Sequence, residues 1–259
     1  MQLIKYIIFF LSFSMLCQEN VSTTLIAKTK LDLKSLVQID NFGALYYIKE
    51  NTFSIQNKTN TLNYSNVQLG QINSANAFNP LKVNVFYRNF NTTVILDNRL
   101  AEIVKVNFSN LQPFRDITHI STGNDNTIWA FNQNTQQLEL FDYITNKTRA
   151  KTLPIDGNVI NIYSNYNFCW IMTESFIYCY NYFGSLISKT INNGFSALKE
   201  NNGNLYFLKQ NRLFLKAKNS SKIQTLKLPQ LLIKQFFVTN ETVYIYDGKF
   251  LYHYQLKTN

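Results

Sequence analysis

Few residues in this sequence have side chains that could carry catalysis or hold a metal ion. It contains two histidines, His119 and His253, and three cysteines in 259 residues. A catalytic zinc site needs three protein ligands, and neither histidine has another histidine nearby in the sequence. We therefore expect His119, before a turn, and His253, in the last strand, to be packing or surface residues. The sequence predicts no catalytic residue, no metal site and no cofactor.

The acidic residues also lack the grouping that an enzyme would need. Most lie in predicted turns: Asp97, Asp116, Asp125, Asp142, Asp156, Glu174 and Glu241. Glycoside hydrolysis needs two carboxyl groups within about 5 to 10 Å of each other, and no spacing here marks such a pair. Segment 123–126 lacks the alternating oxygen ligands and the final Glu of a calcium loop. The sequence has no serine nucleophile elbow and no phosphate-binding glycine loop.

The formal net charge is +10, an excess that could attract nucleic acid, anionic lipid or an acidic protein. The densest basic cluster contains Lys209, Arg212, Lys216, Lys218, Lys222 and Lys227. We treat this basic cluster as a candidate binding surface for an acidic protein partner, and ordinary solvated strand faces are the alternative. Nucleic acid is not an expected partner, because the N-terminus predicts export.

Residues 1–17 are typical of a secretory signal peptide. Lys5 precedes an apolar run from Ile7 to Cys17, which is too short for a membrane-spanning helix. A buried N-terminal strand is the alternative interpretation, and the polar residues after Cys17 disfavour it. We expect simple cleavage; membrane association through lipid attachment at Cys17 is the alternative, which Leu16 disfavours. Residues 18–259 then form a single domain.

The remaining sequence repeats. Each unit contains an Asn-rich turn, a strand that opens with hydrophobic or aromatic residues, and a second short strand. The successive anchor residues are Tyr46, Ile95, Trp129, Trp170, Tyr206 and Tyr244. Their spacing of roughly 34 to 49 residues lies in the range of solenoids, propellers and arrays.

Each unit is expected to be a small antiparallel sheet, and no helical periodicity persists, so we predict an all-β protein. In the last unit, Asp247-Gly248 predicts a two-residue hairpin that places Tyr244 opposite Leu251. At other turns, such as Gln210-Asn211, Asn is expected to replace Gly because it tolerates positive φ.

The same register, applied to the fourth unit, places Trp170 opposite Ile177. Cys169 and Cys179 would then point to opposite faces of the hairpin and could not form a disulfide. A wider turn would instead place the two cysteines opposite each other. We favour buried, unbonded cysteines.

Six such units predict a β-propeller of about six four-stranded blades. The last unit lacks a fourth strand, and residues 23–30 could supply it. Pairing the two ends of the chain in this way would close the ring and remove open sheet edges. A seventh blade, and a β-sandwich, are the alternatives.

The turn and strand at 40–46 (Asp-Asn-Phe-Gly-Ala-Leu-Tyr) resemble the blades of secreted quinoprotein-like and two-component-sensor-like propellers, and no narrower family is matched. The composition, rich in Lys and Asn, and the Gln-Glu after the signal are similar to exported proteins of flavobacteria. This resemblance implies a periplasmic location or association with the outer membrane.

The sequence shows clear blade repeats and no group of catalytic residues. We therefore predict a non-enzymatic binding or scaffolding propeller of the cell envelope that mediates protein–protein interaction. The alternative is a carbohydrate-active or ligand-binding propeller that uses the central channel. Two carboxylates and an aromatic platform that converge at the channel would favour this alternative.

Overall fold

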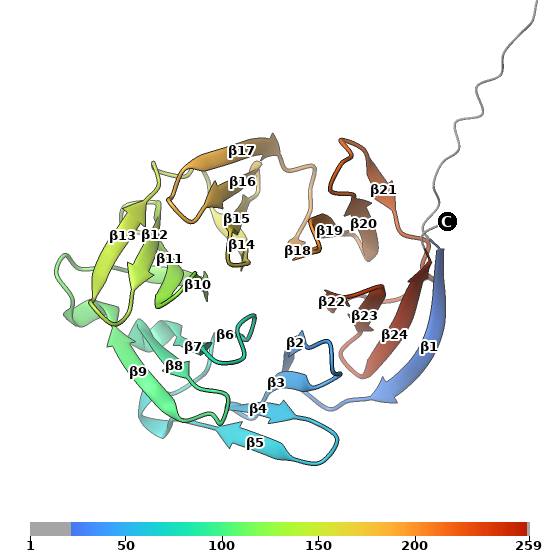
Figure 1. The fold of residues 1–259 in the computed structure, drawn as a ribbon, viewed down its shortest axis with the longest axis horizontal. Helices are drawn as coiled ribbons and strands as arrows, with labels where there is room; N and C mark the ends of the chain where they lie inside the picture. The colour runs from blue at the N-terminus through green and yellow to red at the C-terminus, as the bar shows by residue number, and fades with distance from the viewer. Residues whose placement is uncertain (1–21, 258–259) are drawn as a thin grey trace, which may run out of the picture.

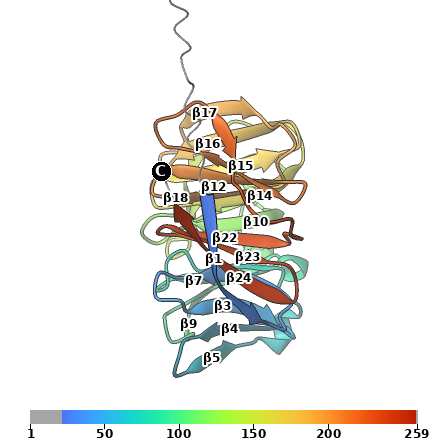
Figure 2. The ribbon, with the colours of Figure 1, turned by 90° about the vertical axis from the view of Figure 1, so that its right-hand side faces the viewer.

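The computed structural model describes residues 22–257, which form six antiparallel sheets of four strands each. The sheets stand like blades around a central axis (Figure 1), and the ring is a flat disc when it is seen from the side (Figure 2). The helical structure of these residues is limited to three short 3-10 turns. The chain is therefore an all-β, six-bladed β-propeller, which confirms the predicted fold and excludes the β-sandwich and the seventh blade.

The first five blades are each made of consecutive strands. Blade 1 contains β2 (Ser35–Ile39), β3 (Leu45–Lys49), β4 (Thr52–Gln56) and β5 (Thr61–Tyr64). Blade 2 contains β6 (Ser74–Asn76), β7 (Val83–Tyr87), β8 (Thr92–Leu96) and β9 (Glu102–Asn107). Blade 3 contains β10 (Ile117–Thr122), β11 (Thr127–Asn132), β12 (Gln137–Asp142) and β13 (Lys147–Lys151).

Blade 4 contains β14 (Val159–Ser164), β15 (Phe168–Thr173), β16 (Phe176–Asn181) and β17 (Leu186–Ile191). Blade 5 contains β18 (Ala197–Asn201), β19 (Asn204–Lys209), β20 (Arg212–Lys216) and β21 (Ile223–Thr225). The 3-10 turns η1 (Val67–Leu69), η2 (Arg88–Phe90) and η3 (Phe108–Asn110) lie in loops of the first two blades.

Blade 6 is built from both ends of the chain. It contains β22 (Gln235–Thr239), β23 (Thr242–Tyr246), β24 (Phe250–Lys257) and, as its outer strand, β1 (Ser22–Lys30). The pairing of β1 with β24 is antiparallel and runs from Ser22 opposite Lys257 to Lys30 opposite Phe250. The predicted closure by the N-terminal strand is thus confirmed. The predicted signal peptide and Cys17 lie outside the described residues.

The apolar core is divided among the interfaces between blades. Six clusters of buried residues each join two neighbouring blades, for example blades 3 and 4 through Trp129, Ile155 and Cys169. The six predicted anchor residues belong to six different clusters, and Tyr244, at the edge of its cluster, is the one that is not buried. The repeat in the sequence therefore reflects one large side chain for each blade interface.

The predicted assignment of the anchor residue to a strand is wrong in blade 2. The other five anchors lie on the second strand of their blades, whereas Ile95 lies on β8, the third strand. The first strand of this blade, β6, has only three residues and is followed by a long loop, residues 77–82. The Asn91 turn therefore joins the second and third strands, and the blade was misaligned by one strand.

The predicted hairpin register is wrong by two residues. Tyr246 lies opposite Leu251, and Tyr244 lies opposite His253. The side chain of Asp247 accepts hydrogen bonds from the backbone N–H groups of Lys249, at 2.7 Å, and Phe250, at 2.6 Å. Asp247 and Phe250 therefore form the last residue pair of the hairpin, and the two turn residues are Gly248 and Lys249 instead of Asp247 and Gly248.

The same correction applies to the cysteine-bearing hairpin, where Met172, and not Trp170, lies opposite Ile177. Cys169 lies opposite Tyr180, and Cys179 lies opposite Trp170. Because side chains alternate between the faces of a strand, the two cysteines still point to opposite faces. Both are buried and unbonded, as predicted, and burial raises the pKa of the Cys179 thiol to about 12.

Asparagine does supply many of the turns. Five asparagines have positive φ: Asn51, Asn91, Asn146, Asn202 and Asn211. The predicted Gln210-Asn211 turn has φ values of 46° and 59°, as expected for a tight hairpin with both central residues in the left-handed region.

The antiparallel order gives the disc two distinct faces. One face, which we call the loop face, carries the loops between the first and second strands of the blades. The opposite face, which we call the connector face, carries the segments that lead from one blade to the next.

Candidate functional site at the central channel

The innermost strands of the six blades, β2, β6, β10, β14, β18 and β22, surround the central channel (Figure 1). Residues of five of these strands or their ends line an inner cavity of about 240 Å³. A larger hollow of about 570 Å³ lies at the loop face, and one of about 340 Å³ lies at the connector face. Val37 and Lys199 line all three hollows.

The loop-face hollow, which we call the channel mouth, is rich in aromatic side chains. Its lining includes Phe42, Phe78, Tyr163, Tyr166 and Phe237. The side chain of Phe42 is 92% exposed, and that of Tyr166 is 47% exposed. Phe78 of blade 2 makes an edge-to-face contact with Tyr166 of blade 4, at 4.9 Å between ring centroids. Loops from different blades thus present aromatic surface around one opening.

Two carboxylates lie at the channel mouth, and both hold loops in place. Asp40 accepts hydrogen bonds from the backbone N–H groups of Phe42, at 2.9 Å, and Ala44, at 2.8 Å. Glu200 accepts from the backbone N–H of Gly203, at 2.6 Å, and from Asn165 Nδ2, at 2.7 Å. Through these hydrogen bonds the two carboxylates help to position the loops of the channel mouth.

Lys199 is the basic residue of the inner cavity. It lies on β18 of blade 5, and its Nζ atom is 5.1 Å from the ring centroid of Tyr163 and 5.2 Å from that of Phe237. It has no ion pair or side-chain hydrogen bond to any residue in the part of the chain that the structure describes. Burial lowers the pKa of Lys199 from 10.5 to about 8.

The inner cavity is also lined by His119 of β10. Its Nδ1 atom is 2.9 Å from the Thr118 hydroxyl, and its ring packs edge-on against Phe131. Burial and the nearby Arg88 lower the pKa of His119, so its ring is neutral at pH 7. His253 lies on β24 and stacks on Tyr244. Both histidines pack against aromatic rings, which agrees with the expectation that they are packing or surface residues.

A network of hydrogen bonds ties together the channel walls of blades 2, 3 and 4. The Asn76 side chain bonds to Ser121 and Thr122, at 3.2 and 2.7 Å. Ser121 and Ser164 share a hydrogen bond of 2.7 Å, and Ser164 also donates to the backbone oxygen of Thr122. These hydrogen bonds connect the inner strands of the three blades.

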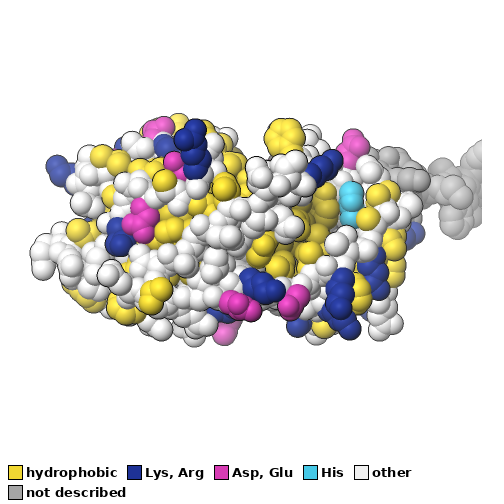
Figure 3. Space-filling view, turned by 90° about the horizontal axis from the view of Figure 1, so that it is seen from below, with side chains coloured by type: hydrophobic (Ala, Val, Ile, Leu, Met, Phe, Trp, Pro, Cys, Tyr) yellow, Lys and Arg dark blue, Asp and Glu magenta, His cyan; other side chains and the backbone are white. Residues whose placement is uncertain are grey.

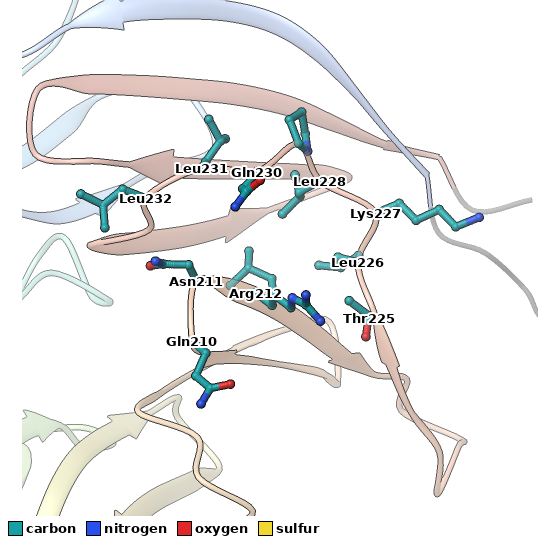
Figure 4. Close-up of a pocket in the computed structure, with 12 residues that line it drawn as sticks. Gln210, Asn211, Arg212, Thr225, Leu226, Lys227, Leu228, Gln230, Leu231 and Leu232 are labelled. Atoms are coloured by element: carbon teal, nitrogen blue, oxygen red, sulfur yellow. The ribbon is translucent and has the colours of Figure 1, made fainter.

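The basic cluster predicted from the sequence is divided in the structure. Lys209, Arg212 and Lys227 lie at the connector-face end of blade 5, and Lys216, Lys218 and Lys222 lie at its loop-face end. Figure 4 shows a groove of about 720 Å³ between blades 5 and 6, lined by Arg212 and a leucine-rich connector. The Lys227 side chain extends away from this groove (Figure 4). The six residues are not one patch.

Charges elsewhere are mixed. Figure 3 looks onto the edge of the disc and shows basic and acidic side chains scattered among uncharged ones. Among residues 22–257, no group of three or more His, Cys, Asp or Glu is arranged to hold a metal ion. Within the same residues, no helix is long and apolar enough to cross a membrane.

Sequence reasoning missed the residues of the channel. Lys199 was not part of the basic cluster, and the aromatic residues of the mouth come from strands and loops of four blades. The available signal was positional: β18 immediately precedes the strand that carries the fifth anchor, Tyr206, so a lysine inside it lies next to the channel.

Comparisons with known proteins support the fold and nothing narrower. No protein family and no curated protein matches the chain. Among solved structures, a streptogramin B lyase has a TM-score of 0.61 at 14% identity over 86% of this chain and 78% of the lyase. A chain of the mitotic checkpoint complex has a TM-score of 0.59 at 8% identity, over 98% of both chains.

A third similar structure is PorZ of Porphyromonas gingivalis, a bacterial surface component of the type-IX secretion system. Its TM-score is 0.53 at 13% identity, over 86% of this chain and 31% of PorZ. The class of protein that these likenesses define is a generic β-propeller without a specific family.

Proposed function

We propose that this protein is a non-enzymatic binding propeller of the cell envelope, and that a partner protein docks on the loop face at the channel mouth. One observation carries the proposal: aromatic side chains from separate blades gather around one opening, and Phe42 is 92% exposed there. Aromatic residues dominate the binding energy of protein interfaces when they become buried at the centre of a contact.

The surroundings of the aromatic residues support binding rather than catalysis. The two carboxylates of the mouth are bound to loop backbone and to an asparagine side chain, and His119 has a hydroxyl partner but no carboxylate partner. The loops are also held firmly, since Asp40 caps the turn that presents Phe42. A preorganised surface loses less conformational entropy when a partner binds.

The envelope location rests on the predicted signal at residues 1–17 and the resemblance of the N-terminus to exported proteins. PorZ, which has the same fold over part of its length, is a bacterial surface component. Fractionation of cells that produce the full chain tests the location. We expect the protein with the periplasmic or outer-membrane fraction, and recovery in the cytoplasm would contradict the proposal.

Crosslinked capture from envelope fractions tests the docking surface. We expect wild-type protein to capture a specific partner and Phe42→Ala to reduce the yield about fivefold or more, as for a central aromatic contact. Leu153→Ala is the matched control, because Leu153 is 83% exposed on the connector face and its loss should leave capture unchanged. Equal capture by the Phe42→Ala protein would contradict docking at the mouth.

A second candidate function is the binding of a small ligand in the channel. The mouth does combine two carboxylates with an aromatic platform, the arrangement expected of a carbohydrate-active or ligand-binding propeller. Because both carboxylates already accept hydrogen bonds from the protein, this observation favours ligand binding over hydrolysis. Titration with sugars and with small organic acids, followed by calorimetry, distinguishes this candidate from protein docking alone.

A further inference from the structure

The inner cavity contains one cationic side chain without a counter-ion. Of the residues that line it, Lys199 is the single lysine or arginine, and none is Asp or Glu. The neighbouring Glu200 uses its two oxygens on Gly203 and Asn165. Charged groups inside proteins are normally paired, so an accessible cavity around an unpaired ammonium group is a place for an external anion.

The position of the ammonium group is determined by two rings. Tyr163 from blade 4 and Phe237 from blade 6 lie 5.1 and 5.2 Å from Nζ, and cation–π attraction holds the lysine between them. The Tyr163 hydroxyl donates to the backbone oxygen of Glu200 at 3.0 Å, which orients that ring. Burial lowers the pKa of Lys199 to about 8, so most of the amine is still charged at pH 7.

Two amide side chains in the same cavity could complete a site. Gln38 on β2 and Asn161 on β14 line the cavity, and neither side chain has a hydrogen-bond partner among residues 22–257. Each can donate two hydrogen bonds to an oxygen anion. The set of one cation and two amides matches a carboxylate, with a single negative charge, better than a phosphate dianion.

We propose that the central channel binds a carboxylate group, which pairs with Lys199 while its apolar part lies against Tyr163 and Phe237. This inference rests on the proposed binding function and names the chemistry that the channel recognises. The inner cavity, of about 240 Å³, has room for a small molecule or one inserted side chain, and not for a folded segment. The carboxylate comes either from a free organic acid or from an acidic side chain of the docked partner.

Calorimetric titration with phenylacetate and with succinate tests the site. We expect wild-type protein to bind phenylacetate, and Lys199→Met to weaken binding about tenfold, the loss expected for one charge-assisted hydrogen bond. 2-Phenylethanol, which keeps the ring and lacks the charge, should bind as weakly to the wild type as phenylacetate does to Lys199→Met. Absence of binding by both acids, or unchanged affinity in Lys199→Met, would overturn the proposal.

Lys147→Met is the matched control, because Lys147 is an exposed lysine on the outer strand β13 that lines none of the channel hollows, and its loss should change affinity less than twofold. Near-ultraviolet circular dichroism shows whether each variant is folded. Lys199→Arg keeps the charge and should retain more affinity than Lys199→Met.

Capture from envelopes distinguishes the two sources of the carboxylate. If Lys199→Met loses the partner and phenylacetate elutes it from the wild type, the partner supplies the carboxylate. If phenylacetate binds at Lys199 and the partner is retained, the source is a free acid. If the partner is captured equally by both proteins and neither acid binds, the docking function stands and the carboxylate site is wrong.

Discussion

At the scale of single residues, Lys199 has a consequence for stability that depends on pH. Its pKa is about 8 in the folded protein and 10.5 ordinarily, so the folded state binds fewer protons between these values. The free energy of unfolding should therefore rise as the pH increases from about 8 toward 10.5. The destabilising contribution of Lys199 is fully present below pH 8. The cost at pH 7, reduced for partial exposure, is on the order of 2 kcal/mol.

Urea unfolding of wild type and Lys199→Met at pH 7 and pH 9.5 checks this prediction. We expect Lys199→Met to be more stable at pH 7 and the difference to shrink at pH 9.5. The comparison cancels the tyrosines, among them Tyr46 and Tyr143, whose pKa values burial raises to about 12 and whose stabilising contribution is lost only above about pH 10. A difference that is the same at both pH values would contradict the prediction.

A second residue-scale prediction concerns the buried ion pair of blade 3. Arg115 Nε donates to Glu139 Oε2 at 3.0 Å, and both side chains are at most 5% exposed. Burial alone would raise the pKa of Glu139, but hydrogen bonds from Thr148, Asn132 and Arg115 outweigh it and lower the pKa. Removing the carboxylate leaves Arg115 as an unpaired buried charge, which is strongly destabilising.

We expect Glu139→Ala to lower the free energy of unfolding by about 3 to 5 kcal/mol. Asp156→Ala, which removes an exposed ion pair with Lys189, should cost less than about 1 kcal/mol. Urea unfolding at pH 7 measures both changes. Similar losses in free energy of unfolding in the two variants would show that the buried ion pair matters no more to stability than the exposed one.

At the scale of elements, β1 is the strand whose loss should matter most. It pairs along β24 and covers what would otherwise be an open edge of blade 6. Exposed edges of this kind pair with other chains. Deletion of residues 1–30 should lower the melting temperature and produce oligomers or aggregates. Size-exclusion chromatography and thermal unfolding measure these effects.

Deletion of residues 1–21 is the control for this experiment. It leaves β1 in place, and we expect a monomer with the melting temperature of the full chain. If the longer deletion behaved in the same way, the closing strand would not be needed for the ring.

The elements also show how far the sequence could be interpreted. The strand-period pattern and the anchors predicted six blades and the closing strand, because these depend on local alternation and regular spacing. The register was wrong by two residues, since the Asp247 cap that lengthens the hairpin cannot be distinguished from a two-residue turn in the sequence. Side chains alternate between the two faces of a strand, so an error of two residues leaves every side chain on its predicted face. The prediction that the two cysteines point to opposite faces and are unbonded was therefore unaffected.

At the scale of the whole molecule, the candidate site depends on which side chains the closed ring brings together around its axis, and the sequence does not display those contacts. Tyr163, Lys199 and Phe237 are separated by about forty residues each and meet only because three blades point at one axis. The basic cluster shows the opposite effect: residues close in the sequence are separated to two faces by the antiparallel strands of blade 5. Local patterns therefore predict blades well and sites poorly.

Because blade 6 combines strands from both ends of the chain, the ring is completed late during synthesis. β1 is the first described strand to be synthesised, and its partner β24 is the last. Blades 1 to 5 can form as their strands become available, but the ring stays an open arc until synthesis has reached the C-terminal strand. During that interval β1 lacks the strand that it pairs with in the finished ring, and the ring is not yet closed around its axis. Closure of the last blade thus marks the moment at which the residues of the candidate site first come together.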